Sequence, residues 1–238
     1  MTSTQSIAFD LAGQGAADRT VVVAEHQTAG RGRRGHLWQD EPGENLLCSI
    51  IVRSSLPISR RPLLSFTAAV AVAGALAEVA AVDARLKWPN DVLIGERKVA
   101  GILLESKGAT STSTPANFDP TIIGIGVNVT QSQFGPELAG LATSVVLESD
   151  RTIPRDTLLD ALLDHFDRWR GRLEKEGFAP VREAWLTLAD TIGREVRVDG
   201  KTGLAVGLDE DGALLLREGG RTHRVVAGTP MNSGKGRD

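Results

Sequence analysis

Hydrophobic spacing separates a long first part of the chain, in which helices and strands mix, from a short last part made of strands. Leu, Phe and Trp recur every three to four positions over 154–175, which predicts a helix that ends at Gly177. A shorter helix is predicted over 181–188. Continuous apolar runs predict buried strands at 20–24, 46–53, 99–105 and 121–128, with a short strand at 85–87.

After Gly193 the apolar runs become short and are separated by Gly-containing pairs that are typical of hairpin turns. The predicted strands are 195–199, 204–208, 214–217 and 224–227. This pattern predicts a small all-β barrel at the end of the chain. The segment 108–120, which is rich in Ser and Thr, is predicted to be the mobile tip of a hairpin.

Two helices near the start complete the expected layout. Ser3 or Thr4 is a suitable cap for a helix that reaches about Ala12. The stretch 63–82 has the length of a membrane span, but it consists mostly of Ala and Val and contains Glu78. We interpret it as a small-residue helix buried against a sheet. The fold class predicted is therefore α+β, a mixed β-sheet packed with helices plus the terminal barrel.

Composition then removes several functional classes. The 238 residues carry 27 Lys and Arg against 30 Asp and Glu, a net charge of -3, and this near balance argues against bulk electrostatic binding of nucleic acid. One Cys excludes an internal disulfide, and four His leave few soft ligands for zinc. The first residues have neither the basic nor the apolar region of a secretory signal, so a cytoplasmic protein is expected.

The run Gly30-Arg31-Gly32-Arg33-Arg34-Gly35 is the most unusual segment. Three guanidinium groups repel one another in so short a loop, and their planar donors suit a phosphate or carboxylate. The run also matches GxGxxG, but 36–42 does not open a helix, which argues against a dinucleotide-binding fold. No HRD or DFG is present, which argues equally against the glycine-rich loop of a kinase. A solvated basic turn that contacts nucleic acid remains open on this segment alone.

Three further segments carry polar groups or glycines at strand ends. Lys87-Trp88-Pro89-Asn90-Asp91 presents an amide and a carboxylate, or is simply a turn with Trp88 in the core. In 97–103, Gly101 interrupts a strand that starts with Lys98, which is either functional or solvent-facing. In 123–128, two glycines precede Asn128, and the alternative is a strand packed closely against the Ala-rich helix.

Together, the order and wording of these segments resemble the biotin–protein ligases. The corresponding strings are Ser3-Thr4-Gln5, Gln27, Gly30 to Trp38, Lys87 to Asp91, Lys98 to Leu103, Gly124 to Asn128 and, near the end, 207–216. His36 and Val99 stand where the family usually has a basic residue and Leu. The family's strand before the first string is missing, so we expect the natural start to lie upstream. The length leaves no room for the winged-helix DNA-binding domain of the repressor members.

This resemblance implies a fold like that of biotin ligases and class II aminoacyl-tRNA synthetases, with an SH3-like C-terminal barrel. The expected division is a catalytic domain over 1–190, the barrel over 191–231 and a disordered tail over 232–238. The implied reaction joins biotin to ATP as biotinyl-5′-AMP with Mg²⁺, then transfers biotin to one lysine of the biotin carboxyl carrier domain of an acyl-CoA carboxylase. The implied enzyme is a monomer or weak homodimer that binds neither nucleic acid nor a membrane.

The resemblance also assigns residues to roles. Biotin is expected to contact Ser3, Thr4, Gln5, Gln27, Arg31, Gly32, Arg33, Lys98 and Gly101. ATP is expected to contact Arg33, Arg34, His36, Trp38, Lys87, Asn90 and Asn128. The catalytic set is Lys98, Arg33 and Asp91, with Asp91 also the candidate Mg²⁺ ligand. Two alternatives stay open: a lipoate or octanoate ligase of the same fold, and a non-enzymatic nucleic-acid binder.

Overall fold

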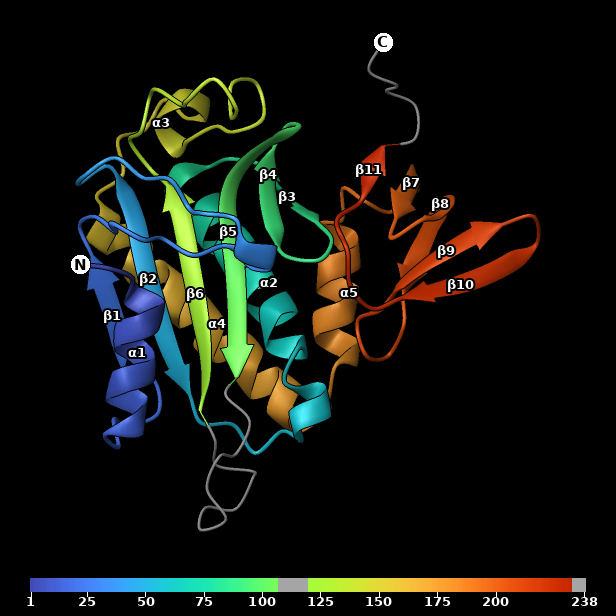
Figure 1. Cartoon of the computed structure of the whole chain (residues 1–238), viewed down its shortest axis with the longest axis horizontal. Helices are drawn as coiled ribbons and strands as arrows, with labels where there is room; N and C mark the ends of the chain where they lie inside the picture. The colour runs from blue at the N-terminus through green and yellow to red at the C-terminus, as the bar shows by residue number, and fades with distance from the viewer. Residues whose placement is uncertain (107–119, 233–238) are drawn as a thin grey trace.

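The computed structural model describes residues 1–106 and 120–232, so the predicted hairpin tip at 108–120 lies almost entirely outside the described residues. Its centre is a six-stranded sheet in the order β1-β2-β6-β5-β4-β3 (Figure 1). The strands are β1 (Val21–Ala24), β2 (Asn45–Val52), β3 (Ala84–Lys87), β4 (Asp91–Ile94), β5 (Arg97–Ser106) and β6 (Thr121–Asn128).

All ladders in this sheet are antiparallel, whereas a mixed sheet was expected. The reason is that β3, β4 and β5 follow one another through short turns, and a short turn joins only antiparallel neighbours. Parallel pairing occurs in the described residues as two isolated bridges, Leu86 with Ala189 and Lys98 with Ala142.

One face of the sheet is covered by the helices α2 (Leu63–Ala80) and α4 (Arg155–Glu176), with α5 (Ala179–Thr187) beside them. The stretch Ile58–Ala80 is apolar and long enough to cross a membrane, and an 18-residue window within it has a mean hydropathy of 1.9, yet 72% of that window is buried inside the protein. Small side chains allow α4 to lie close, since a Cβ on Gly74 would come within 2.5 Å of His165 Nδ1. The prediction of a buried core helix is confirmed.

The opposite face of the sheet is only partly covered. Helix α1 (Thr4–Gly13) packs there on β1, β2 and β6 through a second apolar cluster that includes Ala8, Ile51 and Ile122. Ser3 caps this helix, as predicted, by accepting a hydrogen bond from the Gln5 N–H. The segment between β1 and β2 crosses in front of β6 and β5 (Figure 1).

The last part of the chain is a five-stranded antiparallel sheet in the order β10-β9-β8-β7-β11. Its strands are β7 (Glu195–Val198), β8 (Lys201–Leu208), β9 (Leu214–Glu218), β10 (Arg221–Val225) and β11 (Met231–Asn232). The sheet is open, not a closed barrel, because β11 pairs with β7 for only two residues and the described strands contain no β10–β11 ladder. Asn232 therefore belongs to a strand, one residue inside the tail expected from the sequence.

Trp88 joins the two sheets. Its ring is 2% exposed, and its Nε1–H donates to the Gly212 carbonyl in the turn between β8 and β9 at 3.0 Å. Its backbone N–H donates to Thr191 Oγ1 at 2.9 Å. The interpretation of Trp88 as a core anchor is confirmed, and the anchor holds the residues that follow it, Asn90 and Asp91, at the edge of the open face.

Candidate active site

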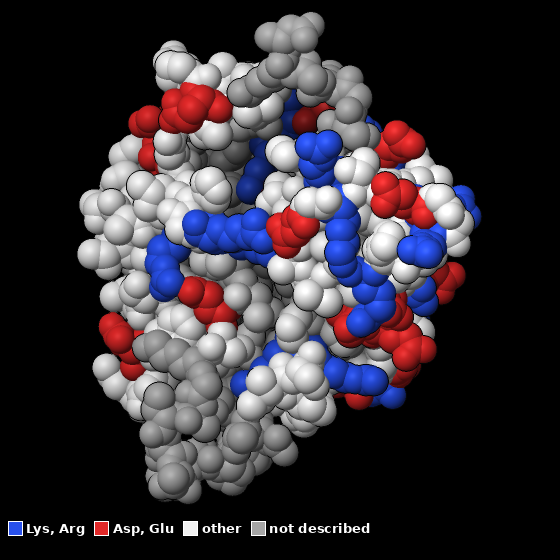
Figure 2. Space-filling view, turned by 45° about the vertical axis from the view of Figure 1, so that its right-hand side comes forward, with Lys and Arg blue, Asp and Glu red and all other residues white. Residues whose placement is uncertain are grey.

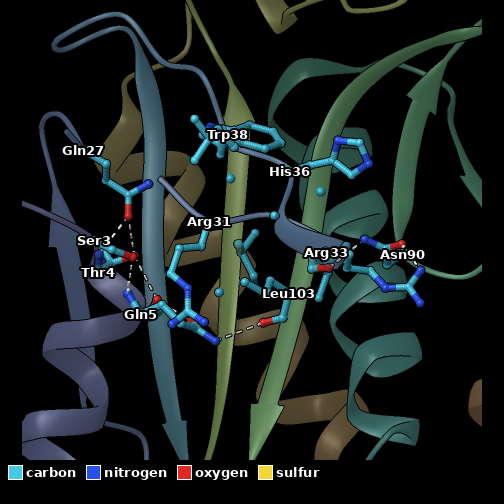
Figure 3. A pocket seen from close by; sticks show the side chains of 18 of the residues that line it. Ser3, Thr4, Gln5, Gln27, Arg31, Arg33, His36, Trp38, Asn90 and Leu103 are labelled. Carbon is cyan, nitrogen blue, oxygen red and sulfur yellow. Dashed lines mark hydrogen bonds between the residues drawn. The ribbon is translucent and has the colours of Figure 1, made fainter. Parts of the chain in front are cut away.

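A cavity of about 240 Å³ lies on the open face of the large sheet. Most of the residues singled out from the sequence line it, although they come from four separate segments (Figure 3). They are Ser3, Thr4, Gln5, Gln27, Arg31, Gly32, Arg33, His36, Trp38, Asn90, Asp91, Lys98 and Gly101. Lys and Arg side chains gather around the hollow at the centre of this face (Figure 2).

One end of the cavity is a closed network of uncharged polar groups at the start of α1. Gln27 Oε1 accepts hydrogen bonds from the Thr4 N–H at 2.8 Å and from Thr4 Oγ1 at 3.1 Å. Ser49 Oγ lies 2.9 Å from Thr4 Oγ1 and 3.0 Å from Gln5 Oε1, while Gln5 Nε2 donates to the carbonyls of Leu103 and Ile122. Because these side chains hold one another, they offer fixed donors and acceptors to a small polar ring.

The Arg-rich segment forms a tight hairpin over the cavity. The Trp38 N–H donates to the Gly30 carbonyl and the Gly32 N–H donates to the His36 carbonyl at 2.8 Å. Arg34 and Gly35 turn the chain at the tip with positive φ values of 54° and 79°, a conformation that favours glycine. Asp40 holds the base of the hairpin through its contacts with His26 and with the Gln27 N–H.

The three guanidinium groups of this hairpin point to different partners. Arg31 pairs with Glu105 at 2.6 Å, and Arg34 pairs with Asp199 of the C-terminal sheet at 3.3 Å. Arg33 faces the cavity, where it donates to Asn90 Oδ1 at 3.0 Å and reaches the Gly228 carbonyl at 3.5 Å. Burial, followed by the charge of Arg34, lowers the pKa of the Arg33 guanidinium. Such a half-buried cation, with no ion pair to a carboxylate among the described residues, is suited to an incoming anion.

A β-bulge turns Lys98 toward the cavity. Val92 pairs with Ala100 and Leu93 with Lys98, so Val99 is an extra residue on β5. Ala100 and Ile102 join the core behind the sheet, and Gly101 and Leu103 face the cavity. Strict alternation would therefore put Lys98 on the core side. The extra residue reverses this order, so that Val99 is buried in the core and Lys98 lines the cavity.

Lys98 meets an acidic and an aromatic partner inside the cavity. Its Nζ lies 2.6 Å from Asp91 Oδ1 and 5.6 Å from the centre of the Trp38 ring. No group of three or more His, Cys, Asp or Glu side chains that could hold a metal occurs in the described residues. Mg²⁺ keeps several waters and takes only one or two carboxylates together with phosphate oxygens, and Asp91 fits that limited role.

Trp38 lies flat on strand backbone that only glycine permits. A Cβ on Gly126 would stand 2.6 Å from Trp38 Cε2, and a Cβ on Gly101 would stand 3.0 Å from its Cζ3. The indole Nε1 is buried and has no hydrogen-bond partner among the described residues. The two glycines therefore seat the ring over β5 and β6, with a polar atom still to be satisfied.

Replacing Gly126 by alanine is expected to displace the Trp38 ring, because overpacking of this kind costs about 1–3 kcal/mol. Oxidation of Trp38 by N-bromosuccinimide, located by mass spectrometry, is expected to be faster in this variant. Gly171→Ala is the matched control, since a Cβ there meets no atom within 4 Å. An oxidation rate equal to that of the unmodified protein would contradict this seating of the ring.

Three residues expected at the site do not line the cavity. Arg34 points to Asp199, and Lys87 ends β3 opposite Asp91. Asn128 is 4% exposed, and its Nδ2 donates to the Thr143 carbonyl at 2.9 Å.

Other residues line the cavity without having been assigned to a ligand from the sequence. Six of them lie within the motif segments already described, namely Leu37, Ile102, Leu103, Gly124, Ile125 and Gly126, whereas Cys48, Ser49 and Thr229 lie outside those segments. Cys48 contributes an uncharged thiol to the wall of the cavity, because burial raises the pKa of this thiol to about 12. Ser49 has a recognisable signal, since it is the one hydroxyl within the apolar run 46–52. Thr229 has none, because only the position of the C-terminal sheet brings it here.

Comparisons with known proteins agree with this geometry. Residues 1–128 match the Biotin/lipoate A/B protein ligase family, and 191–229 match the Biotin protein ligase C terminal domain. The biotin–[acetyl-CoA-carboxylase] ligase of Paracoccus denitrificans is 38% identical over 90% of both chains. The bifunctional ligase/repressor BirA of Bacillus subtilis is 36% identical over 91% of this chain and 67% of its own. The Aquifex aeolicus biotin protein ligase, solved with biotin and ATP, superposes with a TM-score of 0.83 at 27% identity, covering 97% of this chain and 94% of that one.

Proposed function

The chain belongs to the biotin/lipoate A/B protein ligase family, and we propose how its cavity performs the two steps of a biotin–protein ligase. In the first step, biotin and ATP form biotinyl-5′-adenylate and pyrophosphate. In the second, biotin passes to a lysine of a carrier protein. The carrier class follows from the relatives, which are named as ligases for acetyl-CoA carboxylase.

The observation that carries this proposal is the layout of the cavity. The fixed polar network around Thr4, Gln27 and Ser49 lies at one end, and Arg33 lies toward the other beside Asn90 (Figure 3). Lys98 lines the same cavity and contacts Asp91, the neighbour of Asn90 in the chain. Leu103 supplies apolar wall between these two ends of the cavity. Biotin has the same order of parts: a ureido ring, an apolar chain and a carboxylate. We assign the ring to Ser3, Thr4, Gln5 and Gln27, with Arg31, Gly32 and Gly101 along the chain.

Adenylate formation needs positive charge more than a nucleophilic side chain. A carboxylate oxygen of biotin attacks the α-phosphorus of ATP, the new P–O bond forms, and pyrophosphate leaves. Both reactants are anions, so preorganised cations lower the barrier by offsetting the charge where it gathers. We assign this task to Lys98 and Arg33. Mg²⁺, where it binds the phosphates, would supply further charge neutralisation, with Asp91 as the one carboxylate among the described residues that line the cavity.

The second step needs a neutral amine and a place for its proton. The acceptor lysine attacks the carbonyl carbon of the mixed anhydride, the amide bond forms, and AMP leaves with the bonding electrons. Asp91 is suited to take the proton, since its carboxylate lies in the cavity next to Lys98. The contact with Lys98 also fixes the orientation of this carboxylate.

The nucleotide is assigned to the side of the cavity formed by His36, Trp38 and Asn90, beside Arg33. Arg34 and Lys87 lie outside the cavity wall, so their expected contacts with ATP require the nucleotide to extend beyond it. One N–H of Asn128 Nδ2 is donated to Thr143, so Asn128 keeps its second N–H and its oxygen atom for adenine, and the oxygen suits the exocyclic amino group.

We propose a division into a catalytic domain over 1–190 and a C-terminal domain over 191–231. The acceptor is a biotin carboxyl carrier domain of an acyl-CoA carboxylase. The enzyme is proposed to act as a monomer or weak homodimer in the cytoplasm.

Acid-dependent exchange between ATP and labelled pyrophosphate tests the substrate assignment. Biotin is expected to drive exchange, and lipoate or octanoate at the same concentration is expected to drive it less by about 100-fold or more, since the polar network would be left without its partner. Exchange driven equally well by octanoate would instead identify an acyl ligase of the same fold. Binding to DNA that falls steeply with salt, without any exchange, would favour the nucleic-acid binder.

A further inference from the structure

The β-bulge that turns Lys98 toward the cavity lies where β5 has run past the end of β6. The last β5–β6 pair in this direction is Ala100 with Val127, so Lys98 has no partner on β6. Another segment takes that place. The Lys98 N–H donates to the Leu141 carbonyl at 2.8 Å, and the Thr143 N–H donates to the Lys98 carbonyl at 2.9 Å. Both backbone groups of Lys98 are therefore held by 141–143.

The carboxylate of Glu148, at the end of the short helix α3 (Val145–Glu148), links the 141–143 segment to β5. It accepts a hydrogen bond from Thr143 Oγ1 and an ion-pair hydrogen bond from Arg97 Nη2. Arg97 directly precedes Lys98, and Thr143 is the residue that holds the Lys98 carbonyl. The side chain of Glu148 is 16% exposed and Thr143 is fully buried, whereas the side chain of Arg97 is 44% exposed. The carboxylate and its bond to Thr143 are therefore shielded from solvent, and the guanidinium reaches them from the surface.

The 141–143 segment is also tied to the large sheet. Asn128 Nδ2 donates to the Thr143 carbonyl, and the Val146 N–H donates to the Val129 carbonyl at 2.9 Å. These contacts anchor the 141–143 segment to the end of β6, so that the segment holds the neighbouring strand β5 in place at Lys98. A bulge is a local distortion that bends the strand and leaves a residue unpaired, so its geometry depends on such external contacts.

We propose that Glu148, acting through Arg97 and Thr143, is a positioning residue for Lys98. These three residues form what we call the Glu148 clamp. The clamp holds the β5 bulge in the register that buries Val99 and directs the Lys98 ammonium to the meeting point of carboxylate and phosphate. This role rests on the adenylate-forming function proposed above. Glu148 itself touches neither substrate; its effect is transmitted through the backbone of Lys98.

Removal of the carboxylate is expected to act on the rate of the chemical step. In biotin-dependent ATP–pyrophosphate exchange, Glu148→Ala is expected to lower kcat by about 10- to 100-fold, since a misplacement of about 1 Å costs a factor of that order. The dissociation constant of biotin, measured by calorimetry, is expected to change by less than about threefold, because the polar network lies elsewhere. Glu148→Gln is expected to restore most of kcat, since its amide oxygen still accepts from Thr143 and Arg97.

The matched control is Glu176→Ala, which removes a carboxylate from the exposed i,i+4 pair with Arg172 on α4. It is expected to leave kcat unchanged. A kcat of Glu148→Ala equal to that of the control, or a loss that appears in biotin affinity instead of kcat, would overturn the proposal.

A second pair of variants decides the matter if Glu148→Ala fails to fold. Thr143→Val removes the hydroxyl that reaches Glu148 and keeps the side-chain shape, whereas Thr143→Ser keeps the hydroxyl. Lower kcat in the first and near-normal kcat in the second supports the clamp, and equal kcat in both contradicts it. The unmodified enzyme distinguishes a failure of the proposed function from a failure of the clamp. If it shows no exchange with biotin, the proposed function is wrong. If it shows normal exchange and the variants have the same kcat, only the positioning role of Glu148 is wrong.

Discussion

Lys98→Ala is expected to lower the rate of biotinyl-adenylate formation by about 10²- to 10³-fold, the usual effect of removing one preorganised charge-stabilising group. The reason is geometric. Lys98 is turned into the cavity by the bulge at Val99, and its ammonium group meets Asp91 there at 2.6 Å. Biotin binding is expected to persist, because the ureido ring is assigned to the network around Thr4 and Gln27 at the opposite end.

Pyrophosphate release in a single turnover measures this effect, with biotin affinity determined separately by calorimetry. Lys175→Ala is a suitable control, since that lysine is exposed at the end of α4. Pyrophosphate release by Lys98→Ala at the normal rate would remove Lys98 from the catalytic set. A loss confined to biotin affinity would place its role in substrate binding instead.

The second large effect is expected on stability. Trp88→Ala is expected to cost about 3–5 kcal/mol of unfolding free energy, the range for truncating a buried aromatic residue. Trp88 is 2% exposed and joins the two sheets through its bond to Gly212. Trp88→Phe keeps most of the packing but leaves the Gly212 carbonyl unpaired, so a smaller cost of about 1–3 kcal/mol is expected.

Urea denaturation of the two variants measures these costs, which separate the packing of the ring from its hydrogen bond. Equal costs for Phe and Ala would show that the hydrogen bond to Gly212 dominates. A cost below about 0.5 kcal/mol for Ala, within the usual range of surface substitutions, would contradict the anchoring role. Loss of activity in Trp88→Phe at a temperature where the protein is folded would show that the anchor also positions Asn90 and Asp91.

The local signals of the sequence were sufficient for the long elements. The strand at 121–128 agrees with β6 at both ends, and the helix at 154–175 corresponds to α4, because long periodic segments carry their own pattern of burial. The cap at the start of α1 was narrowed to Ser3 or Thr4, because capping depends on only a few neighbouring residues, and the structure shows that Ser3 is the cap.

Other features depend on contacts between segments that are distant in sequence, so no local pattern of hydrophobic and polar residues predicts them. The apolar run at 99–105 predicted β5, but alternation alone would point Lys98 to the core, and only the pairing of Leu93 with Lys98 reveals the bulge. The open C-terminal sheet has a similar cause: β11 exists because Met231 and Asn232 meet β7. Helix α3 is a single turn, too short to show a helical period.

The same distinction between local and long-range information applies to the candidate site. The glycine and arginine motif identified the residues that line the cavity, whereas the partner of each guanidinium came from the fold. Arg33 faces the cavity and Arg34 faces Asp199, although they are neighbours in one motif, because the chain turns between them at positive φ. The single hydroxyl of Ser49 within an apolar strand marks the residue as unusual, but its role becomes clear only from its contacts with Thr4 and Gln5, which are distant in sequence.

Transfer of labelled biotin to a biotin carboxyl carrier domain tests the central claim most directly. The enzyme is incubated with ATP, Mg²⁺ and the carrier, and a carrier in which the acceptor lysine is replaced by arginine serves as control. The account predicts label on the lysine carrier alone, dependent on ATP and lost in Lys98→Ala. Absence of label on the lysine carrier, with a folded enzyme and saturating ATP and biotin, would contradict it.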